Sequence, residues 1–172
     1  MITIHDYTKL NPSGFVERVL NFAFGIVGVK DANVTVTVDE AFLQKMSPPD
    51  IEYEGILVPS PLDHTYILRV KDVSKGEMLR ILAHEAVHIS QQERGDLKVN
   101  PDTLECRWKG EKYTNDYPYM DRPWEKEAFK TQAEILKAYR ASEKQEKLST
   151  PQPGCALIIL LFLILSISLW ML

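Results

Sequence analysis

The sequence predicts one α+β domain followed by a single C-terminal transmembrane helix. Three observations predict this arrangement: short runs of β-branched residues, two long helical patterns, and a last segment without charge. With the last segment set apart, about 150 residues remain, which is enough to bury one compact core. We therefore expect a globular domain over residues 1–148, a linker over residues 149–154 and a membrane helix over residues 155–172.

The predicted strands lie in the first half of the chain, between two predicted helices. Apolar residues at helical spacing over residues 15–27 indicate an amphipathic helix, and residues 39–46 indicate a shorter one. Residues 34–38 alternate Val and Thr, which is typical of a strand. Residues 55–58 and 65–70 are rich in aliphatic side chains, and we expect two further strands there.

A helix with a well-defined start follows these strands. Ser74 would be its N-cap residue, and Glu77 would complete a capping box. The helix then carries a His-Glu-x-x-His motif, formed by His84, Glu85 and His88. Two His four residues apart lie on one helix face and can reach one zinc ion, while the Glu between them can contact a metal-bound water. The alternative is a buried helix that carries two His for structural reasons.

The third zinc ligand is expected from a second helix. A catalytic zinc ion usually takes three protein ligands and leaves its fourth position to water. The two other His, His5 and His64, have no supporting motif. A helical pattern begins at Pro123, and its first turn offers Glu125 and Glu127. A carboxylate from this helix is therefore the better candidate.

Together, the two helices resemble the gluzincin branch of zinc metallopeptidases over about residues 74–140. Gluzincins pair the His-Glu-x-x-His helix with a Glu from a later helix, often in the context Glu-x-x-Ala-Asp or Glu-x-x-Ala-Asn. Glu125 and Ala128 match this pattern, so the resemblance assigns the third ligand to Glu125, with Glu127 as the alternative. Phe129 stands where many gluzincins have an Asp or Asn that orients a zinc-binding His.

The resemblance implies a zincin-like fold, in which a small sheet packs on the two helices. It also implies zinc-dependent hydrolysis of a peptide or protein substrate, with His84, His88 and Glu125 as zinc ligands and Glu85 as general base. In such folds an edge strand commonly binds the extended substrate, and residues 65–70 are the candidate for that strand. The alternative is that residues 65–70 are simply part of the sheet.

Hydrolysis of this kind also needs a second electrophile, besides zinc, for the tetrahedral intermediate. Five side chains are chemically suitable, and nothing in their spacing selects among them: Tyr113, Tyr117, Tyr119, Arg122 and His64. All but His64 belong to residues 96–122, which are rich in Tyr, Asp, Asn and Pro. We expect residues 96–122 to be an irregular loop that could cap the cleft.

The C-terminal segment predicts a membrane anchor. Residues 155–172 carry no charge, and as a helix they would span roughly 27 Å, close to a bilayer core of about 30 Å. Trp170 near the far end suits the membrane interface. Because the N-terminus lacks a signal-peptide pattern, we expect a single-pass membrane protein, with the lipid bilayer as partner and the domain in the cytoplasm. Basic residues precede the span, in agreement with the positive-inside tendency: Lys137, Arg140, Lys144 and Lys147.

Composition argues against a nucleic-acid partner. The chain has 24 Asp plus Glu against 20 Lys plus Arg, and it shows no basic stripe. Cys106 and Cys155 are the only cysteines, and their positions favour a reducing compartment over a structural disulfide. Two alternatives to a peptidase stay open: a catalytically inactive zincin-like binding module, and a membrane-anchored structural or interaction protein.

Overall fold

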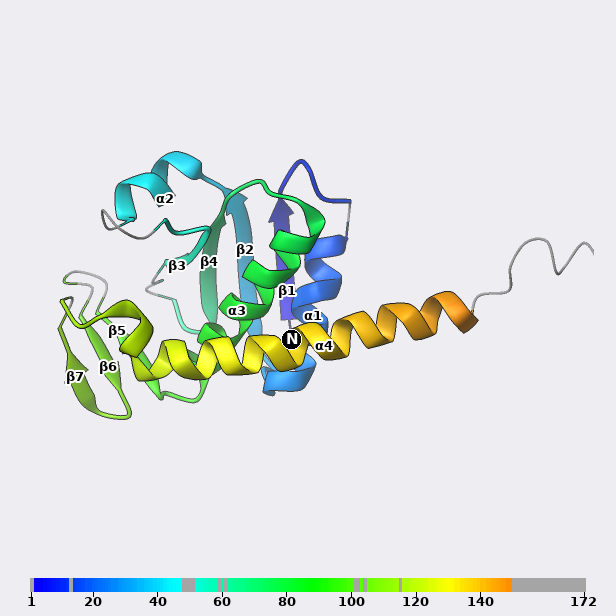
Figure 1. The fold of residues 1–172 in the computed structure, drawn as a ribbon. Helices are drawn as coiled ribbons and strands as arrows, with labels where there is room; N and C mark the ends of the chain where they lie inside the picture. The colour runs from blue at the N-terminus through cyan, green and yellow to red at the C-terminus, as the bar shows by residue number, and fades with distance from the viewer. Residues whose placement is uncertain are drawn as a thin grey trace, which may run out of the picture. The chain divides into compact units, whose positions relative to one another are not determined.

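The structure is a computed structural model that describes residues 2–12, 14–47, 52–58, 60, 62–100, 103, 105–114 and 116–149. These residues form an α+β arrangement with four α-helices and two small sheets (Figure 1). The chain divides into two compact units, Met1–Lys137 and Ala138–Leu172. The predicted membrane helix and all but the first residue of the predicted linker lie outside the described residues. Within the described residues, no helix has the length and apolar character needed to cross a bilayer.

Helices and strands alternate through the first half of the chain, and short strands precede the last helix. In chain order the elements are β1 (Ile2–Tyr7), α1 (Phe15–Val27), β2 (Ala32–Val38), α2 (Glu40–Met46), β3 (Gly55–Val58), β4 (Thr65–Val70), α3 (Lys75–Glu93), β5 (Leu97–Val99), β6 (Cys106–Trp108), β7 (Glu111–Tyr113), the 3-10 turn η1 (Tyr119–Asp121) and α4 (Pro123–Ser149). The helices and strands predicted in the first half are confirmed, and β1 was not predicted.

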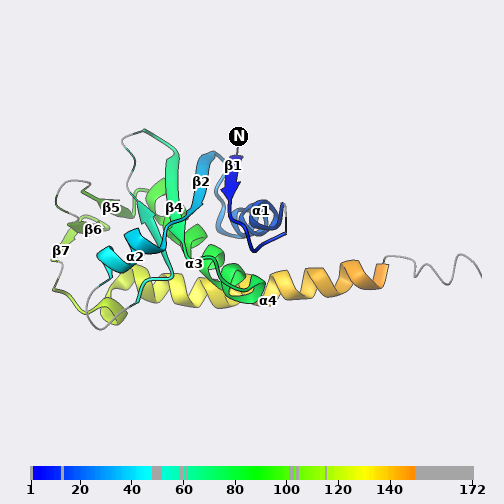
Figure 2. The ribbon, with the colours of Figure 1, turned by 90° about the horizontal axis from the view of Figure 1, so that it is seen from above.

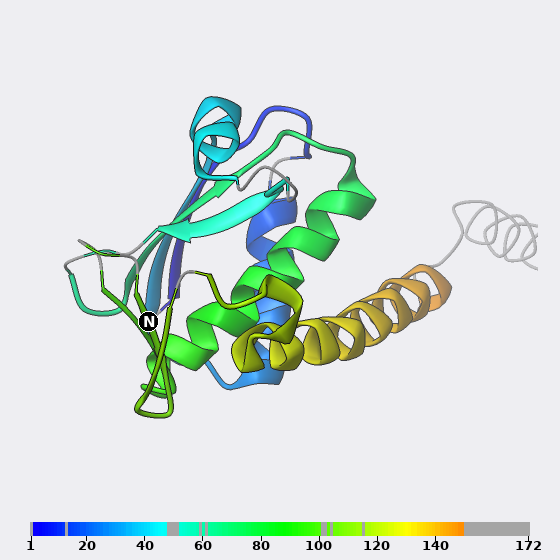
Figure 3. The same ribbon diagram turned by 60° about the vertical axis from the view of Figure 1, so that its left-hand side comes forward.

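The larger sheet has the strand order β1-β2-β4-β3. Its first three strands are parallel, and β3 runs antiparallel to β4 at one edge. Helices α1 and α3 pack against each other on one face of this sheet (Figure 3). The core lies between the sheet and these helices, and burial of each large apolar side chain there stabilises the fold by about 1.5–3 kcal/mol. Fully buried members of this core include Phe15, Phe24, Val34, Val36, Leu68, Met78, Leu82 and Ile89.

The structure corrects the prediction that residues 65–70 form the edge strand. β4 lies inside the sheet, because Thr35 of β2 pairs with Ile67 and Leu57 of β3 pairs with Leu68. Its backbone is therefore paired on both sides, and the four-residue strand β3 forms the edge instead. Sequence periodicity could not show this, because both segments are short aliphatic runs and the order of strands in a sheet is set by non-local pairing.

Helix α3 begins where the capping box predicts. The Ser74 hydroxyl accepts a hydrogen bond from the Glu77 N–H, and the Glu77 carboxylate accepts one from the Ser74 N–H. The helix is followed by Gly95, whose φ of +72° favours glycine. From Met78 to Gln91 every side chain of α3 except Arg80 is buried. The His-Glu-x-x-His motif therefore lies in the interior of the domain.

The segment predicted to be an irregular loop instead contains a second sheet. β5, β6 and β7 have three residues each and pair in an antiparallel meander beside the start of α4 (Figure 2). Leu97 and Trp108 of this sheet pack on Trp124, the second residue of α4. Strands this short show no readable period, because their stability comes from pairing and from this cluster. The cluster holds the first turn of α4 in place.

Candidate metal centre

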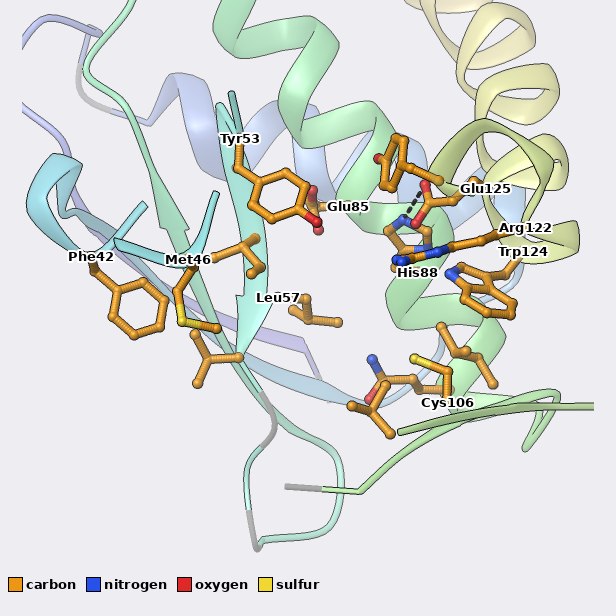
Figure 4. A pocket seen from close by; sticks show the side chains of 17 residues that line it. Phe42, Met46, Tyr53, Leu57, Glu85, His88, Cys106, Arg122, Trp124 and Glu125 are labelled. Atoms are coloured by element: carbon orange, nitrogen blue, oxygen red, sulfur yellow. Dashed lines mark ion pairs between the residues drawn. The ribbon is translucent and has the colours of Figure 1, made fainter. Parts of the chain in front are cut away.

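Three side chains converge in the interior between α3 and α4. The Nε2 atoms of His84 and His88 lie 3.2 and 3.3 Å from one carboxylate oxygen of Glu125 and 3.1 Å from each other. All three residues are buried, with exposed fractions of 8%, 8% and 5%. Figure 4 shows His88 and Glu125 facing each other across this point. The group is one that could hold a metal ion.

Local structure explains why these three side chains meet. His84 and His88 are one helical turn apart on α3, and their rings touch edge to face with centroids 4.7 Å apart. Glu125 is the third residue of α4, whose first turn is anchored by Trp124. A carboxylate in the first turn also lies near the positive end of the helix dipole, which favours its charged form.

The second ring nitrogen of each His is held by a glutamine. His84 Nδ1 lies 3.0 Å from Gln132 Oε1, and His88 Nδ1 lies 2.8 Å from Gln91 Oε1. Because an amide oxygen only accepts, each Nδ1 must carry the proton. In the neutral rings this arrangement leaves the Nε2 lone pairs pointing at Glu125, which is the tautomer that a metal ligand needs.

Gln132 also explains how the chain accommodates Phe129. The Phe129 ring packs on His84 with centroids 4.8 Å apart, and it has no oxygen that could accept a hydrogen bond from that imidazole. Gln132, three residues further along the same face of α4, takes that role. Sequence reasoning missed this residue, although the spacing Glu125, Phe129, Gln132 is a helical i, i+4, i+7 pattern that could have revealed it.

Charges in the buried group depend on one another. Burial works against a charged imidazole, but the neighbouring Glu125 carboxylate outweighs it and raises the pKa of His88 to about 9. Burial likewise works against a charged Glu125, yet the His88 charge and the close contacts with both imidazoles hold its pKa well below the ordinary value. A proton on His88 thus occupies the place at which a divalent cation would balance Glu125.

Glu85 faces the same interior from α3. Burial raises the pKa of its carboxyl group, while the charges of the two His oppose that rise. The backbone of β3 passes close by at Gly55, where an added Cβ would lie 2.5 Å from Ile81 Cγ2 and 3.4 Å from a Glu85 oxygen. Only a glycine lets the edge strand approach this closely.

A cleft of about 430 Å³ opens beside the buried group. One wall comes from α2 and β3, with Phe42, Met46 and Leu57 (Figure 4). The opposite wall comes from the second sheet and the start of α4, with Cys106 and Trp124. Glu85, His88 and Glu125 also line the cleft, so a ligand in it would reach two of the three residues that could hold a metal ion.

The structure separates the five predicted electrophiles. Tyr119 and Arg122 line the cleft. Burial, followed by the charge of Glu125 and a hydrogen bond to it, raises the pKa of Tyr119, so its phenol is protonated and able to donate. Arg122 lies over the rings of Tyr119 and Trp124. Tyr53, which sequence reasoning did not single out, also lines the cleft, with its ring 6.1 Å from that of Tyr119.

The remaining candidates lie elsewhere. Tyr113 packs edge to face on Tyr117 and on Trp124, as part of the second sheet's apolar cluster. His64 pairs with Glu93 at 2.8 Å, in a second hollow. Glu127 pairs with Arg94 at 2.7 Å. Because Glu127 pairs with Arg94 while Glu125 lies beside both His, the structure favours Glu125 over Glu127 as the third donor.

The donor set fits a divalent transition metal. Two imidazole nitrogens and one carboxylate oxygen suit zinc, and three protein donors beside an open cleft leave room for a water or a substrate oxygen. Comparisons of the chain with protein-family models, with curated proteins and with solved structures gave no match. The chain is therefore characterised by its own residues, as an α+β domain with a buried His–His–Glu group that could bind a metal ion.

Proposed function

We propose that the protein is a zinc-dependent metallopeptidase with a minimal zincin-like domain. The single observation that carries this proposal is the convergence of His84, His88 and Glu125 beside a cleft that His88, Glu125 and Glu85 line. A structural role for two buried His would not require a carboxylate from another helix, an open cleft and a second carboxylate, that of Glu85, at the same point.

Zinc, when bound, would lower the pKa of a water toward about 7 and polarise the scissile carbonyl. Glu85 would accept the proton of that water on its carboxylate and later give it to the leaving amine. Its buried position supports this role, because a raised pKa makes a carboxylate a stronger base. Gln91 and Gln132 would keep both imidazoles in the ligating tautomer throughout.

Tyr119 and Arg122 would stabilise the charge that develops on the substrate oxygen. Both line the cleft beside Glu125, and both carry N–H or O–H donors at neutral pH. The other predicted electrophiles have no such position. Tyr119 is the stronger candidate, because its hydroxyl is already held next to a proposed zinc ligand.

The edge strand β3 would hold an extended peptide beside the zinc site. Its outer backbone groups are not used by the larger sheet, whose order ends at β3. Ile56, Leu57 and Val58 line the cleft, and Gly55 lies against Glu85. A peptide that pairs with β3 would therefore bring its backbone over the general base. β3 takes the place of residues 65–70, which were expected to have this role.

The proposal includes a membrane tether. Residues 155–172 would anchor the chain in a bilayer, with the peptidase domain on the cytoplasmic side. Fractionation of cells that express the full chain and a chain lacking residues 151–172 checks this part. Recovery of both chains in the soluble fraction would contradict the tether and leave the peptidase proposal standing.

Metal content and peptide turnover, measured on the same samples, test the function. Wild type, His84→Ala and Glu85→Gln would be loaded with zinc and given a peptide library. We expect wild type and Glu85→Gln to bind one zinc ion, and only wild type to cleave. If wild type binds zinc but turns over no peptide, or if Glu85→Gln cleaves as fast as wild type, the protein is a binding module and not a peptidase.

A further inference from the structure

Gln91 occupies an unusual position for a polar side chain. It lies on α3, three residues after His88, and its exposed fraction is 0%. A buried amide is tolerated when both of its ends have hydrogen-bond partners. Both ends of Gln91 have one: its oxygen accepts from His88 Nδ1 at 2.8 Å, and its nitrogen donates to the Trp124 carbonyl at 2.9 Å.

One of these bonds reaches a candidate metal ligand, and the other reaches the residue next to a second candidate ligand. The first fixes the His88 ring with its Nε2 atom toward Glu125. The second holds the backbone carbonyl of Trp124, the residue directly before Glu125 on α4. One planar amide thus spans the junction between the two helices that supply the ligands.

We propose that Gln91 is a positioning residue that sets the distance and orientation between His88 and Glu125 for metal binding. This proposal deepens the proposed zinc site and rests on it. The function of Gln91 requires both halves of its amide: the oxygen as acceptor for the imidazole, and the nitrogen as donor to α4.

Gln132 provides a matched control. It too is buried and accepts a hydrogen bond from a ligand imidazole, His84 Nδ1 at 3.0 Å. Within the described residues, His84 is the only hydrogen-bond partner of the Gln132 side chain. A carboxylate at position 132 would keep that one bond. At position 91 a carboxylate would keep the bond to His88 but would place an oxygen against the Trp124 carbonyl oxygen.

The experiment compares zinc affinity in the full-length wild type, Gln91→Glu and Gln132→Glu by competition with a chromophoric chelator. We expect Gln91→Glu to bind zinc about 10- to 100-fold more weakly, because it loses the α3–α4 link. Gln132→Glu keeps the one bond to its imidazole, so it should weaken zinc binding much less than Gln91→Glu does. Cobalt absorption spectra report the geometry independently and should change more for Gln91→Glu than for Gln132→Glu.

Equal affinities and equal cobalt spectra in all three chains would overturn the role of Gln91. Equal weakening in both variants would overturn it as well, because the donor half of the amide would then be irrelevant. If wild type binds no zinc, this proposal fails together with the proposed function. If wild type and Gln91→Glu bind zinc alike, only the role of Gln91 fails.

A second measurement needs no variant and covers the case in which Gln91→Glu does not fold. Nitrogen-detected NMR of the zinc-loaded wild type distinguishes imidazole tautomers. We expect His88 to carry its proton on Nδ1 and to bind zinc through Nε2, as the bond to Gln91 dictates. Zinc bound through Nδ1 of His88 would show that Gln91 does not set the ring orientation.

Discussion

Helix α3 contributes to two His–Glu clusters in which the two side chains lie close together but are buried to very different extents. Near its middle, His88 lies 3.3 Å from Glu125 in the buried group. At its C-terminal end, Glu93 lies 2.8 Å from His64 and also accepts from Tyr66, in a group here called the outer cluster. The His64 side chain is 57% exposed, whereas that of His88 is 10% exposed.

The comparison shows that proximity alone does not make a metal centre. In the outer cluster the His64 ring is open to water, and the pair adds only a local interaction. In the buried group three donors converge away from water, so each charge depends on a partner. Burial and a third donor from another helix, not the His–Glu distance, are what point to metal binding.

The largest expected effect comes from removing one donor of the buried group. Glu125→Gln replaces a charged ligand by a neutral amide and should weaken zinc binding by more than about 100-fold, beyond the usual effect of a change outside the ligand set. Glu93→Gln makes the same change in the outer cluster and should leave zinc binding as in wild type. Metal analysis of the purified chains after dialysis measures both.

A different pair of outcomes would assign the third zinc ligand to another carboxylate. Glu127 is the other acidic residue in the first turns of α4, and it pairs with Arg94. Full zinc content in Glu125→Gln together with loss of zinc in Glu127→Gln would show that the wrong carboxylate was assigned.

The next effect is a pH dependence of zinc affinity, which arises in the buried group. Glu125 raises the pKa of His88 to about 9, so below that pH a proton occupies His88 and zinc must displace it. Zinc affinity should therefore fall as the pH falls below 9, by about tenfold per pH unit while one proton is released. Calorimetry in buffers of different ionisation enthalpy counts the protons, and an affinity unchanged between pH 9 and pH 6 would contradict the prediction.

A smaller effect concerns the packing of β3 on α3. An added methyl group at Gly55 would lie 2.5 Å from Ile81 Cγ2, so Gly55→Ala should shift the edge strand and lower the free energy of unfolding by about 1–3 kcal/mol. Gly76 lies in the exposed first turn of α3 with open space around it, and Gly76→Ala should not destabilise the chain. Urea unfolding of the two variants decides the point, and equal midpoints would argue against a tight β3–α3 contact.

The smallest effect belongs to the outer cluster. A hydrogen bond to Glu93 and its charge raise the pKa of His64. Because this folded-state pKa lies above the unfolded value, the stabilisation is complete below about pH 6.5 and is lost as the pH rises through the raised pKa. His64→Asn tolerates the positive φ of 53° and should lower the melting temperature slightly at acidic pH but not at alkaline pH. A decrease in the melting temperature of His64→Asn that became larger as the pH rose would contradict this prediction.

Local signals in the sequence predicted helix α3 and the placement of its two His well. Ser74 and Glu77 fix the start of α3, and the spacing of His84 and His88 places both rings on one face. The start of α4 at Pro123 was also predicted. These features depend on neighbours within one or two turns, and the sequence therefore contains the information directly.

Non-local pairing limited the rest of the prediction. The position of β4 inside the sheet depends on its pairing with β2, which lies well before it in the sequence, and not only on its neighbour β3. The three-residue strands of the second sheet depend on Trp108 and Trp124 packing together. Gln91 and Gln132 look like ordinary polar helix residues until α3 and α4 are placed beside each other.

Zinc K-edge absorption of the zinc-loaded wild type tests the metal centre most directly. We predict one zinc ion per chain, with two imidazole nitrogens and a carboxylate oxygen at about 2.0–2.2 Å and no sulfur neighbour. A chain that takes up no zinc would contradict the assignment. So would a sulfur at about 2.3 Å, which would indicate a thiolate such as Cys106 in place of Glu125.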